Sequence, residues 1–314
     1  MNAELSHRRD AIAQLVAVLL LCGALASAAM PSRVRAETSE QAPEQDLSEV
    51  GNKLANPLTS LWALSSSFNA PQFFDGNLNN GDPEVGGAMV FQPIMPIPLY
   101  GHGDETWRMI TRPIIPLVFS APDPEGPDQF DHEGGIGDIQ LPLLLALPDH
   151  FAGRFILGAG PVFLFPSATS DALGQNQWAA GPAVVVGYKT ENATFGAFPN
   201  YFRKIGSADQ GANTPDVDQM SLLYFANYRL PEAWQIGFNP TIAYNDKASS
   251  GNKWNVPVGM YVGRTIRIGR LPVNIKVGSE YSVVSQDAFG QRFQFRFQIT
   301  PVIPSLIAKP IFGS

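Results

Sequence analysis

QRFQFRFQIT, residues 291–300, is the stretch of sequence that decides the fold. Polar side chains occupy every second position from Arg292 to Thr300, and phenylalanine or isoleucine fills the positions between them. Residues 234–245, WQIGFNPTIAYN, repeat the alternation. Because successive side chains of a β-strand point to opposite faces, this pattern predicts strands with one polar and one apolar face.

Segments of this kind recur along most of the chain. We expect twelve of them, beginning near Leu58, Gly86, Thr106, Gly135, Gly153, Gln177, Ala193, Val217, Ala233, Lys253, Leu271 and Gln291. The connections alternate in length: residues 121–134 and 167–176 are long, whereas residues 149–152 and 190–192 are short. Short turns on one side and longer loops on the other are typical of an up-and-down barrel in a bacterial outer membrane.

The size of the barrel indicates which face points inward. In a soluble barrel the apolar face would point inward, so alternation alone leaves the direction open. A closed barrel of about twelve strands is wider than the eight-stranded kind that side chains can fill. Its polar face must therefore line the lumen and its apolar face must meet lipid. The prediction is an all-β fold, a transmembrane antiparallel up-and-down β-barrel over residues 58–304, followed by a C-terminal tail at 305–314.

The composition and the N-terminus indicate an exported protein. Charged residues make up 16% of the chain against 45% hydrophobic, with 29 glycines and 27 prolines, which favours strands and turns. A basic start at Arg8, an apolar run and small residues predict a signal peptide over residues 1–36, cleaved after Ala28 or after Ala36. A retained membrane anchor is the alternative. Cys22, the one cysteine, lies in this segment, so the mature protein would have no thiol chemistry.

Residues 37–57 are polar and acidic, and we interpret them as a periplasmic linker. Leu47, Val50 and Leu54 share one face at helical spacing, which predicts a short helix there. The net charge of −7 argues against nucleic acid as a partner. After the signal peptide the sequence has no apolar run long enough for a transmembrane helix, so a membrane location implies strands.

Aromatic residues and prolines are distributed differently over the predicted strands. The tryptophans fall near the strand ends and share the apolar parity, which predicts an interfacial aromatic girdle of Trp62, Trp107, Trp178, Trp234 and Trp254. Ordinary core tryptophans are the alternative. Prolines recur inside the strands, where each removes a hydrogen-bond donor: Pro93, Pro113, Pro142, Pro161, Pro182, Pro199, Pro240 and Pro257.

The proline-bearing strands also resemble a known family. The motifs are NPLTSLW at residues 56–62, QP at 92–93 with Pro96, RPIIP at 112–116, GIGD at 135–138, GAGP at 158–161 and GP at 181–182. Together they resemble bacterial outer-membrane transporter-like proteins related to the barrel proteins of the phenol-degradation meta pathway. The resemblance implies an outer-membrane barrel with a transport role, and it supplies no substrate and no binding residues. One departure is that Gly313 and Ser314 follow Phe312, whereas many such barrels end on an aromatic residue.

The sequence offers little for catalysis or metal binding. His102 and His150 fall in predicted turns and His132 in a predicted loop, so we expect no serine–histidine pair and no enzymatic activity. The carboxylates of residues 123–133 lack the spacing of a calcium loop, and we interpret them as a solvated acidic loop. No metal and no cofactor are expected.

The polar parity predicts a lumen that is mainly basic. The expected lining residues are Gln92, Arg108, Arg112, Asp138, Arg154, Lys204, Arg229, Lys276, Glu280, Arg292 and Arg296. A basic lining opposite an acidic outer rim suits a selective pore, and internal ion pairing that only holds the barrel together is the alternative.

Two functional classes follow from these expectations. The first is an outer-membrane channel or transporter for passive passage of small molecules. The second is a closed structural or surface-interaction barrel whose lumen is filled by side chains or by the segment before Asn56. The expected partners are outer-membrane lipid, a small solute and the outer-membrane insertion machinery.

Overall fold

The computed structural model describes residues 46–80, 82–208 and 215–312. The predicted signal peptide and the first part of the predicted linker lie outside the described residues. Within the described ranges, helices are too short or too polar to span a membrane.

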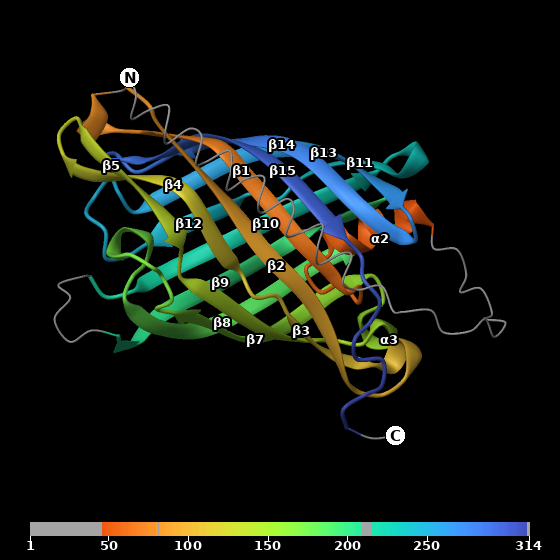
Figure 1. The fold of residues 1–314 in the computed structure, drawn as a ribbon. Coiled ribbons are helices and arrows are strands. Elements are labelled where there is room, and N and C mark those ends of the chain that lie inside the picture. The colour runs from red at the N-terminus through yellow and green to blue at the C-terminus, as the bar shows by residue number, and fades with distance from the viewer. Residues whose placement is uncertain (1–45, 81, 209–214, 313–314) are drawn as a thin grey trace, which may run out of the picture. The chain divides into compact units, whose positions relative to one another are not determined.

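Antiparallel strands make up most of the described chain (Figure 1). The strands are β1 (Ala63–Asp75), β2 (Glu84–Tyr100), β3 (Trp107–Thr111), β4 (Ile115–Gly126), β5 (Gln129–Ile136), β6 (Ile139–Ala146), β7 (Phe155–Phe165), β8 (Gln177–Lys189), β9 (Ala193–Ser207), β10 (Asp218–Arg229), β11 (Trp234–Phe238), β12 (Thr241–Asn245), β13 (Trp254–Ile268), β14 (Leu271–Val284) and β15 (Gly290–Pro301). Strand β1 pairs with β2 on one side and with β15 on the other, so the sheet closes into a barrel.

The fifteen described strands make twelve crossings of the barrel, as the sequence predicted. Three crossings are interrupted, between β3 and β4, between β5 and β6, and between β11 and β12. Pro113 and Pro240 lie in two of these interruptions, because proline cannot donate to the ladder. Pro161 and Pro182 remain inside strands, directly opposite each other across β7 and β8, with both rings exposed on the outside.

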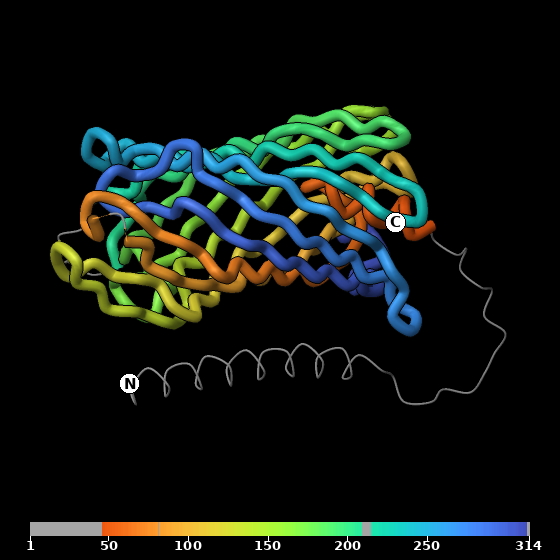
Figure 2. The backbone as a smooth tube through the Cα atoms, turned by 90° about the horizontal axis from the view of Figure 1, so that it is seen from above, coloured from red at the N-terminus to blue at the C-terminus, as the bar shows by residue number. Residues whose placement is uncertain are grey.

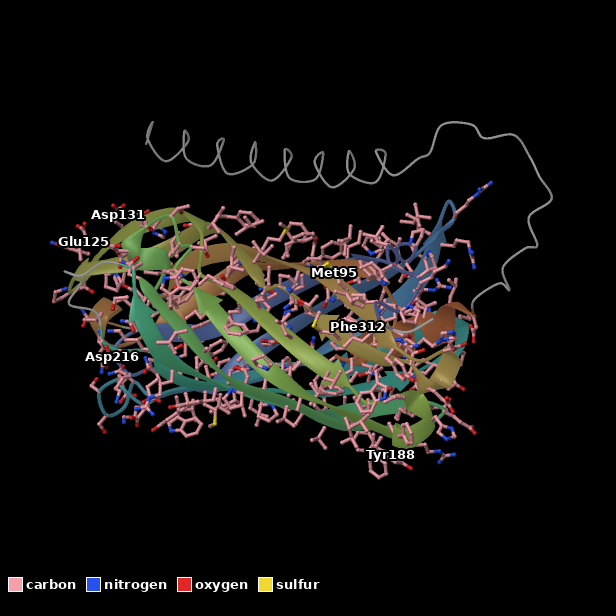
Figure 3. All side chains as sticks on the ribbon, turned by 90° about the horizontal axis from the view of Figure 1, so that it is seen from below. Met95, Glu125, Asp131, Tyr188, Asp216 and Phe312 are labelled. Carbon is pink, nitrogen blue, oxygen red and sulfur yellow. The ribbon has the colours of Figure 1, made fainter. Side chains whose placement is uncertain are left out.

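The two ends of the barrel carry different connections (Figure 1). We call one the short-turn end, with η2 (Gly103–Glu105), α3 (Asp149–Ala152), residues 190–192, η4 (Pro231–Ala233) and residues 269–270. We call the other the long-loop end, with η1 (Asn77–Asn79), the β4–β5 hairpin, η3 (Asp171–Leu173) and the connections around residues 246–253 and 285–289. Figure 3 shows the acidic side chains Glu125, Asp131 and Asp216 at the long-loop end and Tyr188 at the opposite end.

Alternating burial along the strands separates the inside from the outside. On β8, Val185 is 0% exposed, whereas its neighbours Val184 and Val186 are 39% and 50% exposed. On β15, Gln294 is 5% exposed and Phe295 is 49% exposed. The outer surface is apolar on both strands, which suits contact with lipid.

The helix α2 (Leu47–Ala55) contacts β9, β10, β13 and β14, whose inner faces meet only inside the barrel (Figure 2). The helix begins at Asp46, whose carboxylate accepts a hydrogen bond of 2.9 Å from the Ser48 backbone N–H. The sequence indicated a helix here in a periplasmic linker, with a segment that fills the lumen as one of the alternatives. In the structure these residues occupy the lumen at the short-turn end.

Candidate functional site

The lumen has two walls of different chemistry. The apolar wall comes from β3 and β6 to β9, and its buried side chains are Ile110, Leu144, Val162, Leu164, Ala179, Ala183, Val185, Phe198 and Phe202. The polar wall comes from β1, β10, β11 and β13 to β15, and its buried side chains are Ser65, Asn69, Asn227, Gln235, Thr265, Asn274, Lys276, Glu280, Gln294 and Thr300.

This division corrects the expectation of a lumen that is polar all round. Strands β6 to β8 contain runs such as LPLLLA and AVVVG, in which apolar residues occupy both parities. Alternation cannot assign a face in such a run, and closure of the barrel turns one apolar set inward. The lumen is therefore amphipathic, and its basic groups face an apolar surface.

The lumen contains a cavity of about 600 Å³ on the long-loop side of α2. Leu54, Ala55 and Pro57 form its floor, and both walls contribute to its sides. A second cavity of about 420 Å³ lies at the short-turn end, lined by the helix residues Glu49, Asn52 and Lys53. The helix therefore divides the lumen into two compartments, and we call it the plug helix.

The plug helix is fitted closely between the walls. The Thr194 hydroxyl on β9 donates to the Asn52 carboxamide oxygen at 2.7 Å. A Cβ added to Gly51 would lie 2.7 Å from the Thr265 hydroxyl oxygen and 3.1 Å from the Gln235 carboxamide oxygen, so the lack of a side chain at position 51 allows this close approach. On its other side Val50, which is 2% exposed, packs in a cluster with residues from β1, β2 and the C-terminal segment.

Three of the basic groups predicted for the lumen meet in the larger cavity. Gln92, Arg112, Lys276 and Arg296 all line it, although they come from strands far apart in the sequence. Arg296 Nη1 lies 2.8 Å from Glu280 Oε1. Arg112 reaches the Gln92 carboxamide oxygen at 3.5 Å and the Pro57 carbonyl oxygen at 3.4 Å.

The remaining predicted lining residues lie elsewhere. Arg108 borders the smaller cavity, and Arg154 is exposed immediately before β7 at the short-turn end. Arg229 ends β10 at that same end, and Arg292 lies near the start of β15 at the long-loop end. These arginines lie on the inner parity or at strand ends, but parity alone gave no information about their depth along the barrel.

Lys204 and Asp138 hold loops at the long-loop end. Lys204 Nζ lies 2.6 Å from Asp216, and this hydrogen bond holds the pKa of the Asp216 carboxyl below its ordinary value. Asp138 is 8% exposed and accepts backbone hydrogen bonds from Ser167 at 3.2 Å, Ala168 at 3.1 Å and Gln175 at 2.7 Å. Its carboxylate therefore organises the loop after β7 and does not line either cavity.

Of the five tryptophans, three are exposed on the outer surface, one is half-buried and one is buried. Trp178, Trp234 and Trp254 are 44%, 40% and 43% exposed on the outer surface near strand ends. Trp107 is half-buried at the start of β3. Trp62 is 5% exposed, which contradicts its expected contact with lipid. It precedes β1, where the C-terminal segment covers it and the Ile303 N–H donates to its carbonyl oxygen.

A serine–histidine pair exists that the sequence did not predict. His132 lies on β5, not in a loop, and its Nδ1 is 2.8 Å from the Ser120 hydroxyl oxygen on β4. His132 Nε2 is 3.6 Å from a Glu84 carboxylate oxygen on β2. The β4–β5 hairpin extends the strands beyond the predicted segments and brings these residues together. Among the described residues, no cluster of acidic, histidine or cysteine side chains could hold a metal ion.

Comparison with known proteins identifies a family and a fold. A search of curated proteins found no match. An outer membrane channel from Pseudomonas putida F1 has a similar structure, with a TM-score of 0.56 and 14% identity over 79% of this chain and 97% of that one. The Pseudomonas putida toluene transporter TodX gives a TM-score of 0.36 and 12% identity over 80% of this chain and 92% of that one.

Residues 95–297 match the family described as "Putative MetA-pathway of phenol degradation". That range contains the barrel from the middle of β2 to the middle of β15. It includes most of the proline motifs on which the sequence resemblance was based, so the resemblance is confirmed. The chain belongs to this family and has the fold of a bacterial outer-membrane β-barrel.

Proposed function

We propose that this protein is an outer-membrane channel through which small molecules pass passively. The observation that carries the proposal is the amphipathic cavity of about 600 Å³ inside a closed barrel, with the plug helix as its floor. Its size is within the range of small-molecule sites in proteins. The family membership and the fold agree with a channel.

The orientation follows from the export route. The N-terminus precedes the plug helix at the short-turn end, and an exported chain begins its insertion from the periplasm. The short-turn end therefore faces the periplasm and the long-loop end faces the outside. A solute enters from the acidic long-loop end, occupies the larger cavity and must pass the plug helix to reach the periplasm.

The plug helix also supports the competing possibility, a barrel that stays closed. A disulfide that fixes the plug helix to the barrel wall distinguishes a channel from a barrel that stays closed. Thr265 and Gly51 are close enough for Gly51→Cys with Thr265→Cys to place two Cβ atoms near the roughly 3.5–4.5 Å that a disulfide needs. Cys22 is the one cysteine of the sequence and lies in the predicted signal peptide, so the engineered pair would have no competing thiol.

The experiment is conductance and solute uptake in lipid vesicles, with the tethered protein measured before and after reduction. We expect passage in the reduced protein and a large loss in the oxidised one. The wild type, which lacks the engineered cysteine pair, is treated with the same oxidant and reductant as the control. Absence of passage in both wild type and reduced variant would show a closed structural barrel.

We propose no catalytic role for the Ser120–His132 pair. The side chains of His132 and Glu84 are 43% and 31% exposed, so water reaches the pair and weakens the electrostatic stabilisation that catalysis requires. The hydrogen bond instead joins β4 to β5 at the base of their hairpin. Hydrolysis of a p-nitrophenyl ester that is abolished by Ser120→Ala would refute this and establish an esterase.

A further inference from the structure

The positive charge of the larger cavity is not balanced by the protein. Glu280 is the carboxylate of the polar wall, and it is already engaged, with one oxygen 2.8 Å from Arg296 and the other accepting from Gln294 at 2.7 Å. Arg296 also donates to the Asn69 carboxamide oxygen at 3.1 Å. This leaves Arg112 and Lys276, which have no ion-pair partner among the residues that the structure describes.

Lys276 is the stronger indication of a missing ligand. It is 6% exposed, it lines the cavity, and its Nζ lies 4.4 Å from the centre of the Tyr261 ring. Its ammonium group has three donors, which are open to a ligand in the cavity. No hydrogen-bond acceptor for Nζ is found within the described ranges. The positive charges of Arg112 and Arg296 repel the Lys276 ammonium group.

Arg112 supplies the matching geometry. Its two hydrogen bonds, at 3.4 and 3.5 Å, are at the long limit for such contacts, so its donors remain largely available. A guanidinium group presents parallel N–H donors that fit the two oxygens of a carboxylate. Arg112 and Lys276 line the same cavity, so a carboxylate that contacts both would satisfy both cations.

The opposite side of the same cavity requires a different chemistry. Leu164, Phe198 and Phe202 of the apolar wall line it, and none of them offers a polar side-chain group. A small inorganic anion would leave this surface wet, and a hydrocarbon would leave the two cations without a counter-ion. Only a ligand with an apolar body and one anionic end satisfies both sides.

We propose that the larger cavity binds small aromatic or aliphatic carboxylates, with the carboxylate between Arg112 and Lys276 and the body against the apolar wall. This inference rests on the proposed channel function and names the class of solute. The carboxylate end acts as the counter-ion for Arg112 and Lys276, which the protein itself does not provide. Neutral molecules of the same shape bind without that contribution and therefore more weakly.

The test is equilibrium binding to the purified full barrel in detergent, by calorimetry. The probes are benzoate, benzyl alcohol as its neutral counterpart, and acetate as an anion without an apolar body. We expect benzoate to bind about ten- to a hundredfold more tightly than either, as a charge-assisted hydrogen bond provides. Equal affinities for benzoate and benzyl alcohol would overturn the proposal.

Two variants assign the site. Lys276→Met should weaken benzoate binding about tenfold or more and leave benzyl alcohol unchanged. Gln92→Glu is nearly isosteric and gives Arg112 a resident carboxylate, because the Gln92 oxygen already lies 3.5 Å from its Nη2. It should fold normally and also weaken benzoate binding. Arg154→Met, at an exposed arginine outside the cavity, is the matched control and should change nothing.

Retention of full benzoate affinity in Gln92→Glu, confirmed as folded by heat-modifiable gel migration, would also overturn the proposal. Failure of the carboxylate-binding proposal is distinguishable from failure of the proposed channel function. A protein that passes solutes in vesicles but shows no benzoate preference refutes only the solute class. A protein that binds benzoate but passes nothing, in the wild type or with the tether reduced, refutes the channel.

Discussion

Replacing Phe295 with arginine tests the outward face of the barrel directly. Phe295 is 49% exposed near the middle of β15, and its ring packs edge-on against Phe293 with centroids 4.9 Å apart. An arginine at the midplane of the lipid costs about 2–4 kcal/mol. Loss of the ring pair adds about 0.5–1.5 kcal/mol. We therefore expect Phe295→Arg to lower the free energy of unfolding by about 3–5 kcal/mol.

The control must be an inward position with room for the same side chain. Gln294 is unsuitable, because it is 5% exposed and hydrogen-bonded to both Gln72 and Glu280. Thr241 is better, since it lines the larger cavity and is itself exposed there. Thr241→Arg should cost less than about 1 kcal/mol, as substitutions away from tight packing usually do.

The assay is equilibrium unfolding in guanidinium chloride, with the protein refolded into lipid vesicles and followed by tryptophan fluorescence. The midpoint should shift while the slope stays constant, which shows that stability and not compactness has changed. Equal costs for Phe295→Arg and Thr241→Arg would refute the assignment of the two faces.

Three further predictions concern the loops. Asp138→Ala removes three backbone hydrogen bonds and should cost about 3 kcal/mol and make the loop after β7 sensitive to protease, whereas Asp171→Asn in that loop should not. The hydrogen bond from Lys204 lowers the pKa of the Asp216 carboxyl, so the ion pair stabilises the loop at neutral pH and is lost as the pH falls through that lowered pKa. An NMR titration of Asp216 should show the lowered pKa in the wild type, and Lys204→Met should raise it towards its ordinary value. Protease added to intact cells should cut residues 121–134 if it cuts at all, and cleavage confined to α3 would reverse the orientation.

Much of the barrel could be predicted because its signals are local. Period-two alternation assigns the two faces wherever polar and apolar residues take turns, as on β15. Counting the period-two segments predicted the twelve crossings, and the alternating loop lengths predicted the up-and-down order. The helix at Leu47–Ala55 was likewise visible as three apolar residues at helical spacing.

The candidate site was predicted less well, because its residues come together only through register between distant strands. Arg112 and Lys276 line one cavity because β1 pairs with β15 and closes the sheet into a barrel. Glu280, which the sequence predicted for the lining, pairs with Arg296 because β14 lies directly beside β15. His132 pairs with Ser120 because the β4–β5 hairpin continues beyond the predicted strands.

The sequence by itself determined a closed membrane barrel with an apolar outside and a basic component inside, because alternation and loop length are properties of consecutive residues. Only the tertiary structure decided that one wall of the lumen is apolar, because β8 has valines on both parities and closure selects Val185 for the inside. It also decided that the helix before β1 enters the lumen. The space for that helix exists only after the strands have closed around it, with Gly51 fitted against Thr265 and Gln235.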